Sequence, residues 1–292
     1  MISSGHFASL PNGIRLHYAR AGRPGATPLL LLHGFPEYWA AWEALLPLLA
    51  GDFDAVAPDL RGFNLSSQPT EVSAYRAREI VGDLELLCDH LGWQRTDVVA
   101  HDWGGAVAWQ WAIAKPRRIR RLVMLNSPHP ITFARALTRN PAQQAASEYM
   151  NWLRAAGSEV GLAKDNYRAI EGFFSAMKGE GEPWYTAERA VRYREVWARG
   201  LTGGVNYYRA SPLHPPATGE SLPVLDSAQF HVRVPTLIVW GERDHALLPA
   251  LLDGLEELID EVTIERLPHA THWLAHEEPR AIATAIRAFC TG

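Results

Sequence analysis

Short apolar runs recur near both ends of the chain, and each stops at a glycine, proline or polar residue. The runs at residues 28–32 and 54–57 lack the apolar–polar alternation of a half-exposed strand. A strand that is covered on both faces loses this alternation, so the runs predict strands of a buried parallel sheet. Further strands are predicted at residues 96–100, 121–125, 235–240 and 262–267.

Segments with helical spacing separate these predicted strands. Between residues 75 and 90, apolar side chains recur at Ile80, Leu84 and Leu87, and Gly92 follows as a C-terminal stop. Further helices are predicted at residues 39–49, 106–114, 247–258 and 279–290. Alternating strands and helices imply right-handed β-α-β crossovers. The predicted class is therefore α/β, with a mostly parallel central sheet and helices on both faces.

The beginning of the chain departs from this alternation. Asn12-Gly13 lies between two short stretches, residues 7–10 and 14–18, in which apolar and polar side chains alternate. Asn-Gly between two such stretches is a strong signal for a β-hairpin. We therefore expect an antiparallel edge at the start of the sheet.

The middle of the chain departs more strongly. Between residues 131 and 230 no buried strand is predicted, and the helical segments there are interrupted by glycine and proline clusters. These helices are predicted at residues 142–153, 167–174 and 187–198. We expect a core made of residues 1–130 and 231–292, with an inserted helical cap, or lid, of residues 131–230.

Composition narrows the classes of function. The 292 residues are 47% hydrophobic and carry a net charge of −4, so a large core can form and bulk charge attracts neither nucleic acid nor anionic lipid. Two cysteines are too few for a disulfide framework or a zinc ligand set. The sequence contains neither a secretion signal nor an apolar stretch of membrane-spanning length. We expect a cytoplasmic protein without metal or cofactor.

Asp102 lies between a predicted strand and a predicted helix, in the sequence VVAHDWGG at residues 98–105. Small residues stand two positions before it and two after it, at Ala100 and Gly104. A nucleophile elbow needs this spacing, because larger side chains would collide at its strained turn. Aspartate takes the place of the usual serine. The alternative is an ordinary N-cap aspartate of the following helix.

A carboxylate nucleophile favours particular electrophiles. Its attack on an acyl carbon gives a labile anhydride, whereas its attack on a saturated carbon with a strained or good leaving group gives an alkyl ester. Water can then hydrolyse this ester. The expected electrophile is therefore an epoxide carbon or a carbon–halogen centre, and not an ester or amide carbonyl.

Such chemistry requires a base that activates water, an acid that orients the base, and donors for an oxyanion. His272 follows the last predicted strand and Asp244 follows the preceding one, which gives the order nucleophile, acid, histidine along the chain. His269 and His276 are neighbouring alternatives for the base. Backbone N–H groups are the predicted oxyanion donors, at Phe35 and Trp103.

Four sequences together resemble the epoxide hydrolases of the α/β-hydrolase superfamily. They are HGFPE at residues 33–37, PDLRGF at 58–63, HDWGG at 101–105 and NSPHP at 126–130. The resemblance spans nearly the whole chain and implies the α/β-hydrolase fold, with a helical lid inserted after the sixth core strand. Haloalkane and haloacetate dehalogenases share the Asp, Asp and His set, so the motifs specify the superfamily more closely than the substrate.

The resemblance also implies that two lid tyrosines act as acids, because opening an epoxide produces an alkoxide that must be protonated. Tyr208, in the sequence NYYR, matches the second of these tyrosines, and Tyr149 matches the first. A dehalogenase would instead use the neighbourhood of Asn151 and Trp152 to bind halide.

Three further positions separate epoxide hydrolases from dehalogenases. Haloacetate dehalogenases resemble one another in carrying arginines where this chain has Trp103 and Ala106, and haloalkane dehalogenases carry asparagine where it has Phe35. The resemblance gives Glu37 a role in ordering the hydrolytic water, with a solvated loop carboxylate as the alternative. The predicted substrate pocket contains His33 as a structural hydrogen-bonding residue, together with Glu37 and Trp152.

We therefore expect an enzyme that opens epoxides to vicinal diols through an ester on Asp102, which water activated by His272 then hydrolyses. One alternative is a dehalogenase with the same triad. The other is a non-catalytic small-molecule binder on the same scaffold, which has no need of an intact triad. We expect a small-molecule substrate, no nucleic-acid or membrane partner, and a monomer or homodimer.

Overall fold

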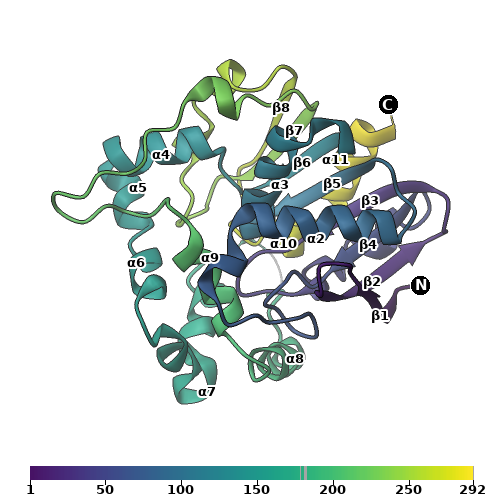
Figure 1. Ribbon diagram of the computed structural model, residues 1–292, viewed down its shortest axis with the longest axis horizontal. Coiled ribbons are helices and arrows are strands. Elements are labelled where there is room, and N and C mark those ends of the chain that lie inside the picture. Colours follow the sequence, from purple (N-terminus) through teal and green to yellow (C-terminus); the bar gives the residue numbers. More distant parts are fainter. Residues whose placement is uncertain (178, 181–182, 292) are drawn as a thin grey trace.

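The computed structural model describes residues 1–177, 179–180 and 183–291. Within these residues eight strands form one sheet in the order β1-β2-β4-β3-β5-β6-β7-β8 (Figure 1). β2 is antiparallel to both of its neighbours, and the other adjacent strands are parallel. The strands are β1 (Ser3–Ser9), β2 (Arg15–Gly22), β3 (Thr27–Leu32), β4 (Phe53–Pro58), β5 (Thr96–His101), β6 (Ile119–Leu125), β7 (Thr236–Gly241) and β8 (Val262–Leu267). The predicted strands are all present.

The predicted hairpin joins β1 to β2. The N–H of Leu10 donates to the carbonyl of Ile14, and the N–H of Gly13 donates to the carbonyl of Leu10. Gly13 has a φ of +82°, a left-handed backbone that glycine adopts without a steric penalty. The hairpin forms the antiparallel edge and leaves the central parallel strands to carry the loops of the site.

The central strands are buried on both faces. In β3, Leu30 and Leu32 pack into one apolar core, whereas Leu29 and Leu31 pack into the other. Successive side chains of a strand point to opposite faces, so a continuous apolar run supplies both cores. This burial explains why the sequence lacks alternation there.

Helices cover both faces of the sheet (Figure 1). α2 (Ala77–His90) and α3 (Asp102–Ala114) belong to the core that contains Leu30. α1 (Leu46–Leu49) and α11 (Pro279–Thr291) belong to the core on the other face. A short helix that the pattern did not predict, α10 (Leu274–Glu277), precedes α11.

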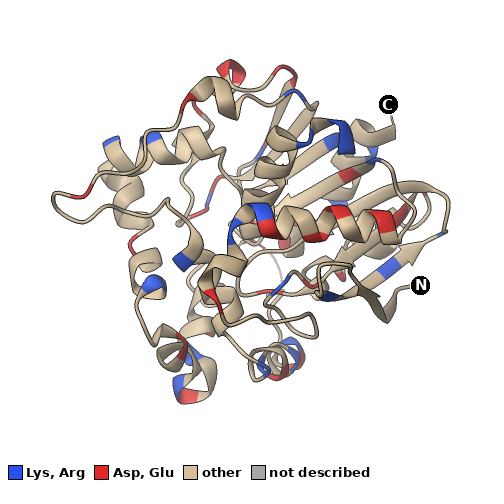
Figure 2. Cartoon of the chain, in the orientation of Figure 1, with Lys and Arg blue, Asp and Glu red and all other residues tan. Residues whose placement is uncertain are grey.

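Between β6 and β7 the described residues form helices and no strand. Figure 1 shows these helices grouped to one side of the sheet. They are α4 (Pro130–Arg139), α5 (Pro141–Ala146), α6 (Tyr149–Arg154), α7 (Ser158–Ser175), α8 (Ala187–Trp197) and α9 (Thr202–Ala210). Helices α4 and α9 were not predicted. Figure 2 shows acidic and basic residues interspersed over the part of the chain that the structure describes.

The helix predicted at residues 247–258 is wrong. The structure has two short 3₁₀ helices there, Pro249–Leu252 and Leu255–Glu257. Gly254, between them, has a left-handed φ of +79°, which interrupts right-handed helical winding.

Two other predicted helices are broken into shorter ones. The segment at residues 39–49 forms a 3₁₀ helix, Trp39–Trp42, followed by α1, because Pro47 lacks the N–H that a continuous helix needs. The segment at residues 142–153 is divided between α5 and α6. There the buried amide of Gln143 hydrogen-bonds the chain at Ala246 and Leu248, so tertiary contacts fix the position of α5.

Candidate active site

Asp102 lies where β5 meets α3, and its φ is +50°. A left-handed φ is uncommon for a residue with a side chain and is typical of strained functional turns. A Cβ added to Gly34 would lie 2.1 Å from Asp102 Oδ1, and one added to Gly104 would lie 2.3 Å from the backbone oxygen of Leu32. The turn therefore has the close packing of a nucleophile elbow. His101, and not Asp102, holds the N-cap position of α3.

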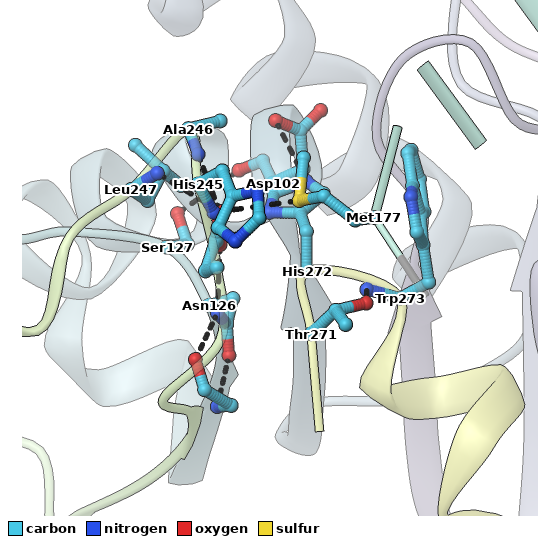
Figure 3. A network of polar contacts seen from close by, with 12 residues as sticks. Asp102, Asn126, Ser127, Met177, His245, Ala246, Leu247, Thr271, His272 and Trp273 are labelled. Carbon is cyan, nitrogen blue, oxygen red and sulfur yellow. Dashed lines mark hydrogen bonds and ion pairs between the residues drawn. The ribbon is translucent and has the colours of Figure 1, made fainter. Parts of the chain in front are cut away.

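The Asp102 carboxylate faces one backbone donor and one imidazole. The N–H of Phe35 donates to Oδ1 at 2.7 Å, and Nε2 of His272 lies 3.7 Å from Oδ2. The hydroxyl of Ser127 donates to the backbone carbonyl of Asp102 at 2.9 Å, which supports the turn from the end of β6 (Figure 3). The carboxylate thus lies between a backbone hydrogen-bond donor and the imidazole of His272.

Asp244 orients His272 through a short hydrogen bond of 2.6 Å between Oδ2 and the ring Nδ1. The N–H groups of Ala246 and Leu247 donate to the other oxygen of Asp244, at 2.8 and 2.9 Å. Asn126 donates to Asp244 Oδ2 at 2.7 Å. Sequence reasoning quoted Asn126 within the NSPHP motif but did not give it this role.

The charges around His272 favour its protonated form. Burial alone opposes the charge, but the carboxylates of Asp244 and Asp102 outweigh burial and raise the pKa of His272 to about 9. Burial likewise opposes the ionised form of Asp244, but His272 and the surrounding hydrogen bonds keep its pKa below the ordinary value. The two groups therefore stabilise each other as an ion pair.

The other two histidines considered as the base lie elsewhere. His269 is exposed, with its Nδ1 3.3 Å from a carboxylate oxygen of Glu180. His276 is buried, with its Nε2 2.6 Å from Glu37. Only His272 among these three forms the ion pair with Asp102.

One of the two predicted oxyanion donors contacts the carboxylate directly. Phe35 presents its N–H to Asp102. Trp103 is the second residue of α3, where backbone N–H groups have no partner within the helix. An oxyanion that develops on the side chain of Asp102 would lie close to the N–H of Phe35.

Two apolar cavities meet at Asp102. The larger, of about 200 Å³, contains Phe35, Phe173 and Trp273 in its wall, and the smaller, of about 80 Å³, contains Trp103. The remaining residues of the larger wall include Ala146, Ala176, Met177, His245, Ala246 and His272. Apolar walls with few polar groups are typical of small-molecule sites.

Tyr149 and Tyr208 line both cavities together with Asp102. Their ring centroids are 6.2 Å apart, and the ring centroid of Trp103 lies 4.8 Å from that of Tyr208. Burial is the main reason that the pKa of each phenol is raised, and the nearby charge of Asp102 raises it further. Both phenols therefore keep their protons at neutral pH.

The three residues predicted for the substrate pocket do not line either cavity. Trp152 is 44% exposed, and Asn151 beside it donates to the carbonyl of Pro215, so this pair faces away from the site. His33 is fully buried and accepts from the N–H of Leu60 at 3.0 Å, and burial lowers its pKa. Its structural hydrogen-bonding role agrees with this placement, whereas a pocket-lining role does not.

Glu37 is buried beneath the site and is not a solvated loop carboxylate. It contacts His276 at 2.6 Å and accepts a hydrogen bond from the hydroxyl of Tyr193 at 2.9 Å. Burial opposes its charge, but His276 and His101 outweigh burial and lower the pKa of Glu37. Sequence reasoning missed these partners, since they lie 156 and 239 residues away along the chain.

Comparison with known proteins places the chain in a family. Residues 27–279 match the α/β-hydrolase fold family, so the chain belongs to that family. Within the described residues no group of three or more His, Cys, Asp and Glu side chains is arranged to hold a metal ion. Across the same residues, no helix combines the length and apolar character that crossing a membrane requires.

Individual relatives and solved structures are more specific than the family match. The chain is 32% identical over 276 residues to the AB hydrolase superfamily protein YfhM of Bacillus subtilis (strain 168), covering 93% of this chain and 92% of that protein. It is 29% identical over 285 residues to epoxide hydrolase 4 of Mus musculus, covering 95% of this chain and 77% of that protein. The crystal structure of a Bacillus megaterium epoxide hydrolase with an inhibitor matches with a TM-score of 0.89 at 30% identity, covering 98% of this chain and 100% of that chain. The predicted fold and the resemblance to epoxide hydrolases are thereby confirmed.

Proposed function

We propose that this protein is an epoxide hydrolase that forms a covalent ester on Asp102. The observation that carries the proposal is that two protonated phenols, Tyr149 and Tyr208, share both cavities with the carboxylate. A carboxylate that attacks a saturated carbon opposite two O–H donors is what epoxide opening requires. Residues 131–230, which carry both tyrosines, act in this proposal as the cap over the site.

Ring opening is the first step. An oxygen of Asp102 attacks the less hindered ring carbon, and the bond between that carbon and the epoxide oxygen breaks. The oxygen takes a proton from Tyr208 or Tyr149 as its negative charge develops, and a tyrosinate remains. The raised pKa values of both phenols support this role, because each is fully protonated before the substrate binds.

Hydrolysis of the ester is the second step. The imidazolium of His272 first gives its proton to the tyrosinate left by ring opening. The neutral His272 then removes a proton from water, whose oxygen attacks the ester carbonyl, and the N–H groups of Phe35 and Trp103 stabilise the tetrahedral oxyanion. The intermediate collapses, its remaining hydroxyl proton passes to the departing alkoxide, and a diol leaves Asp102 as a carboxylate. His272 is again protonated, as before the substrate bound, so one epoxide and one water give one diol.

No comparable observation favours the alternatives. A haloacetate dehalogenase needs a cation for the substrate carboxylate, yet neither cavity wall contains arginine or lysine among the described residues. The side chain of Trp103, which would hold halide in a haloalkane dehalogenase, packs edge-on against the ring of Tyr208, with 4.8 Å between the ring centroids. A non-catalytic binder has no use for the Asp102, Asp244 and His272 hydrogen-bond network.

One parallel assay tests the proposal against both alternatives. The purified protein is incubated with styrene oxide and other epoxides, a panel of haloalkanes, and fluoro- and chloroacetate, and diol and halide are measured together. We expect diol from epoxides and no halide. Halide without diol would identify a dehalogenase, and tight binding without any product would identify a binder. A single turnover in ¹⁸O-labelled water should leave the label on Asp102. The diol departs with an oxygen of the original carboxylate, and the oxygen of the attacking water takes its place.

A further inference from the structure

The two tyrosines of the site belong to two very short helices. Tyr149 begins α6, which has six residues, and Tyr208 lies in α9, which has nine. Helices of this length are not stable alone in water. The separation of the two phenols therefore depends on what fixes one helix against the other.

Arg154, the last residue of α6, reaches across to the end of α9. Its Nη1 donates to the carbonyl of Tyr208 at 2.6 Å and to that of Ser211 at 2.7 Å. The last carbonyls of a helix have no partner within it, and one guanidinium nitrogen has two hydrogens to offer. A cation at a helix C-terminus also interacts favourably with the helix dipole.

Arg209, the residue after Tyr208, makes the reverse contact. Its Nη2 donates to the carbonyl of Ala155, which caps α6, at 2.9 Å. The same nitrogen pairs with Glu159 at 2.6 Å. Each helix thus supplies an arginine that satisfies the C-terminal end of the other.

We propose that Arg154 is a positioning residue for the phenol of Tyr208, which it holds by hydrogen-bonding the carbonyl of that residue. Arg154 lines neither cavity, so it acts only through the placement of α9 against α6. The inference rests on the proposed function, because the phenol positions matter only if an epoxide oxygen must be protonated. Arg154 should then affect ring opening and leave hydrolysis of the ester nearly unchanged.

The test measures the two steps separately in Arg154→Met and Arg154→Lys. Rapid-mixing experiments with styrene oxide give the rate constant of ester formation, and single-turnover decay of the ester gives that of hydrolysis. We expect ester formation to fall at least about tenfold in Arg154→Met, since a displacement of about 1 Å reduces rates steeply. Hydrolysis should change less than about twofold. Arg154→Lys keeps an N–H donor and should recover part of the loss.

Arg287→Met provides a matched control. Arg287, in α11, lines neither cavity. It donates to the carbonyl of Leu48 in the last turn of α1 and also pairs with Asp52 at 2.9 Å. We expect this variant to lose stability but to keep both rate constants. A parallel decrease of both steps in Arg154→Met, or no decrease at all, would overturn the inference. If Arg154→Met does not fold, Arg154→Lys is tested in its place. Its ester formation should fall while its ester hydrolysis keeps the wild-type rate.

A double variant separates this inference from the proposed function. In Tyr208→Phe, Arg154→Met should cause no further decrease in ester formation, because Arg154 acts through Tyr208. Fully additive losses would contradict the inference while the proposed function stands. If the wild-type protein makes no diol, or if Tyr208→Phe opens epoxides at the wild-type rate, the proposed function itself fails.

Discussion

The two halves of the site are held in place by different means. Asp102, Asp244 and His272 each follow a strand of the sheet, and backbone N–H groups bind two of these three side chains. Tyr149 and Tyr208 instead lie on short helices whose contacts are made largely by side chains. The triad thus depends on the path of the main chain, whereas the phenols depend on a few individual side chains.

This difference has a mechanistic consequence. A backbone frame resists peripheral substitutions, since its hydrogen bonds are independent of side-chain identity. The phenol pair has no such frame, so its geometry should change readily with the residues that surround it. Hydrolysis is therefore the robust step in the proposed mechanism, and ring opening is the adaptable one.

The largest effect is expected from Asp102→Asn, which removes the nucleophile that both halves serve. Diol formation from styrene oxide should fall at least about ten-thousandfold, in line with the loss of other nucleophiles. Intact-mass analysis must accompany the assay, because deamidation restores aspartate. Wild-type rates from protein verified to contain asparagine would rule out the covalent role of Asp102.

His272→Gln should separate the two halves. It removes the base of the second step and leaves both phenols intact, so the ester should form and then persist. We expect its hydrolysis to slow by about a hundredfold to ten-thousandfold. Mass spectrometry should detect the substrate mass added to a peptide that contains Asp102. The same experiment with Asp102→Asn is the control and should give no adduct.

Tyr208→Phe probes the other half and is expected to have a smaller effect, because Tyr149 remains as a donor. Ester formation should fall by about tenfold to a hundredfold, while hydrolysis of the ester should keep its rate. Tyr149→Phe should act in the same direction. Rapid-mixing measurements on both variants check this. Equal decreases in both steps would mean that the two halves are not separable.

The sequence indicates which residues meet at the carboxyl edge of the sheet, for a physical reason. A buried parallel strand appears as an apolar run, and the residue that follows it lies at the carboxyl edge of the sheet. That logic identified Asp102, Asp244 and His272, and the small residues at the elbow are explained by the close contacts of Gly34 and Gly104.

The surroundings of these residues were less predictable because their partners are distant in sequence. Glu37 meets Tyr193 and His276 only after folding, and Trp152 shares a segment with Tyr149 yet points to solvent. Helix α9, which carries Tyr208, was not predicted, since glycines occupy two of its nine positions. Here tertiary contacts override local propensity.

The smallest expected effect is on the free energy of unfolding. It tests whether the extra proton of the folded state is bound by His272 and is independent of the phenols. His272 has a pKa of about 9 in the folded protein and an ordinary value of 6.5, so the folded state binds an extra proton between these pH values. Its contribution to stability is fully present below pH 6.5 and is lost as the pH rises through 9, by at most about 1.4 kcal/mol per pH unit. Urea unfolding from pH 6.5 to 9.5 should show this decline in wild type and in Tyr208→Phe, but not in His272→Gln. If the unfolding free energy of His272→Gln falls with pH as steeply as that of the wild type, another group must titrate between pH 6.5 and 9.5. The extra proton of the folded state would then not be held by the ion pair of His272 with the two carboxylates.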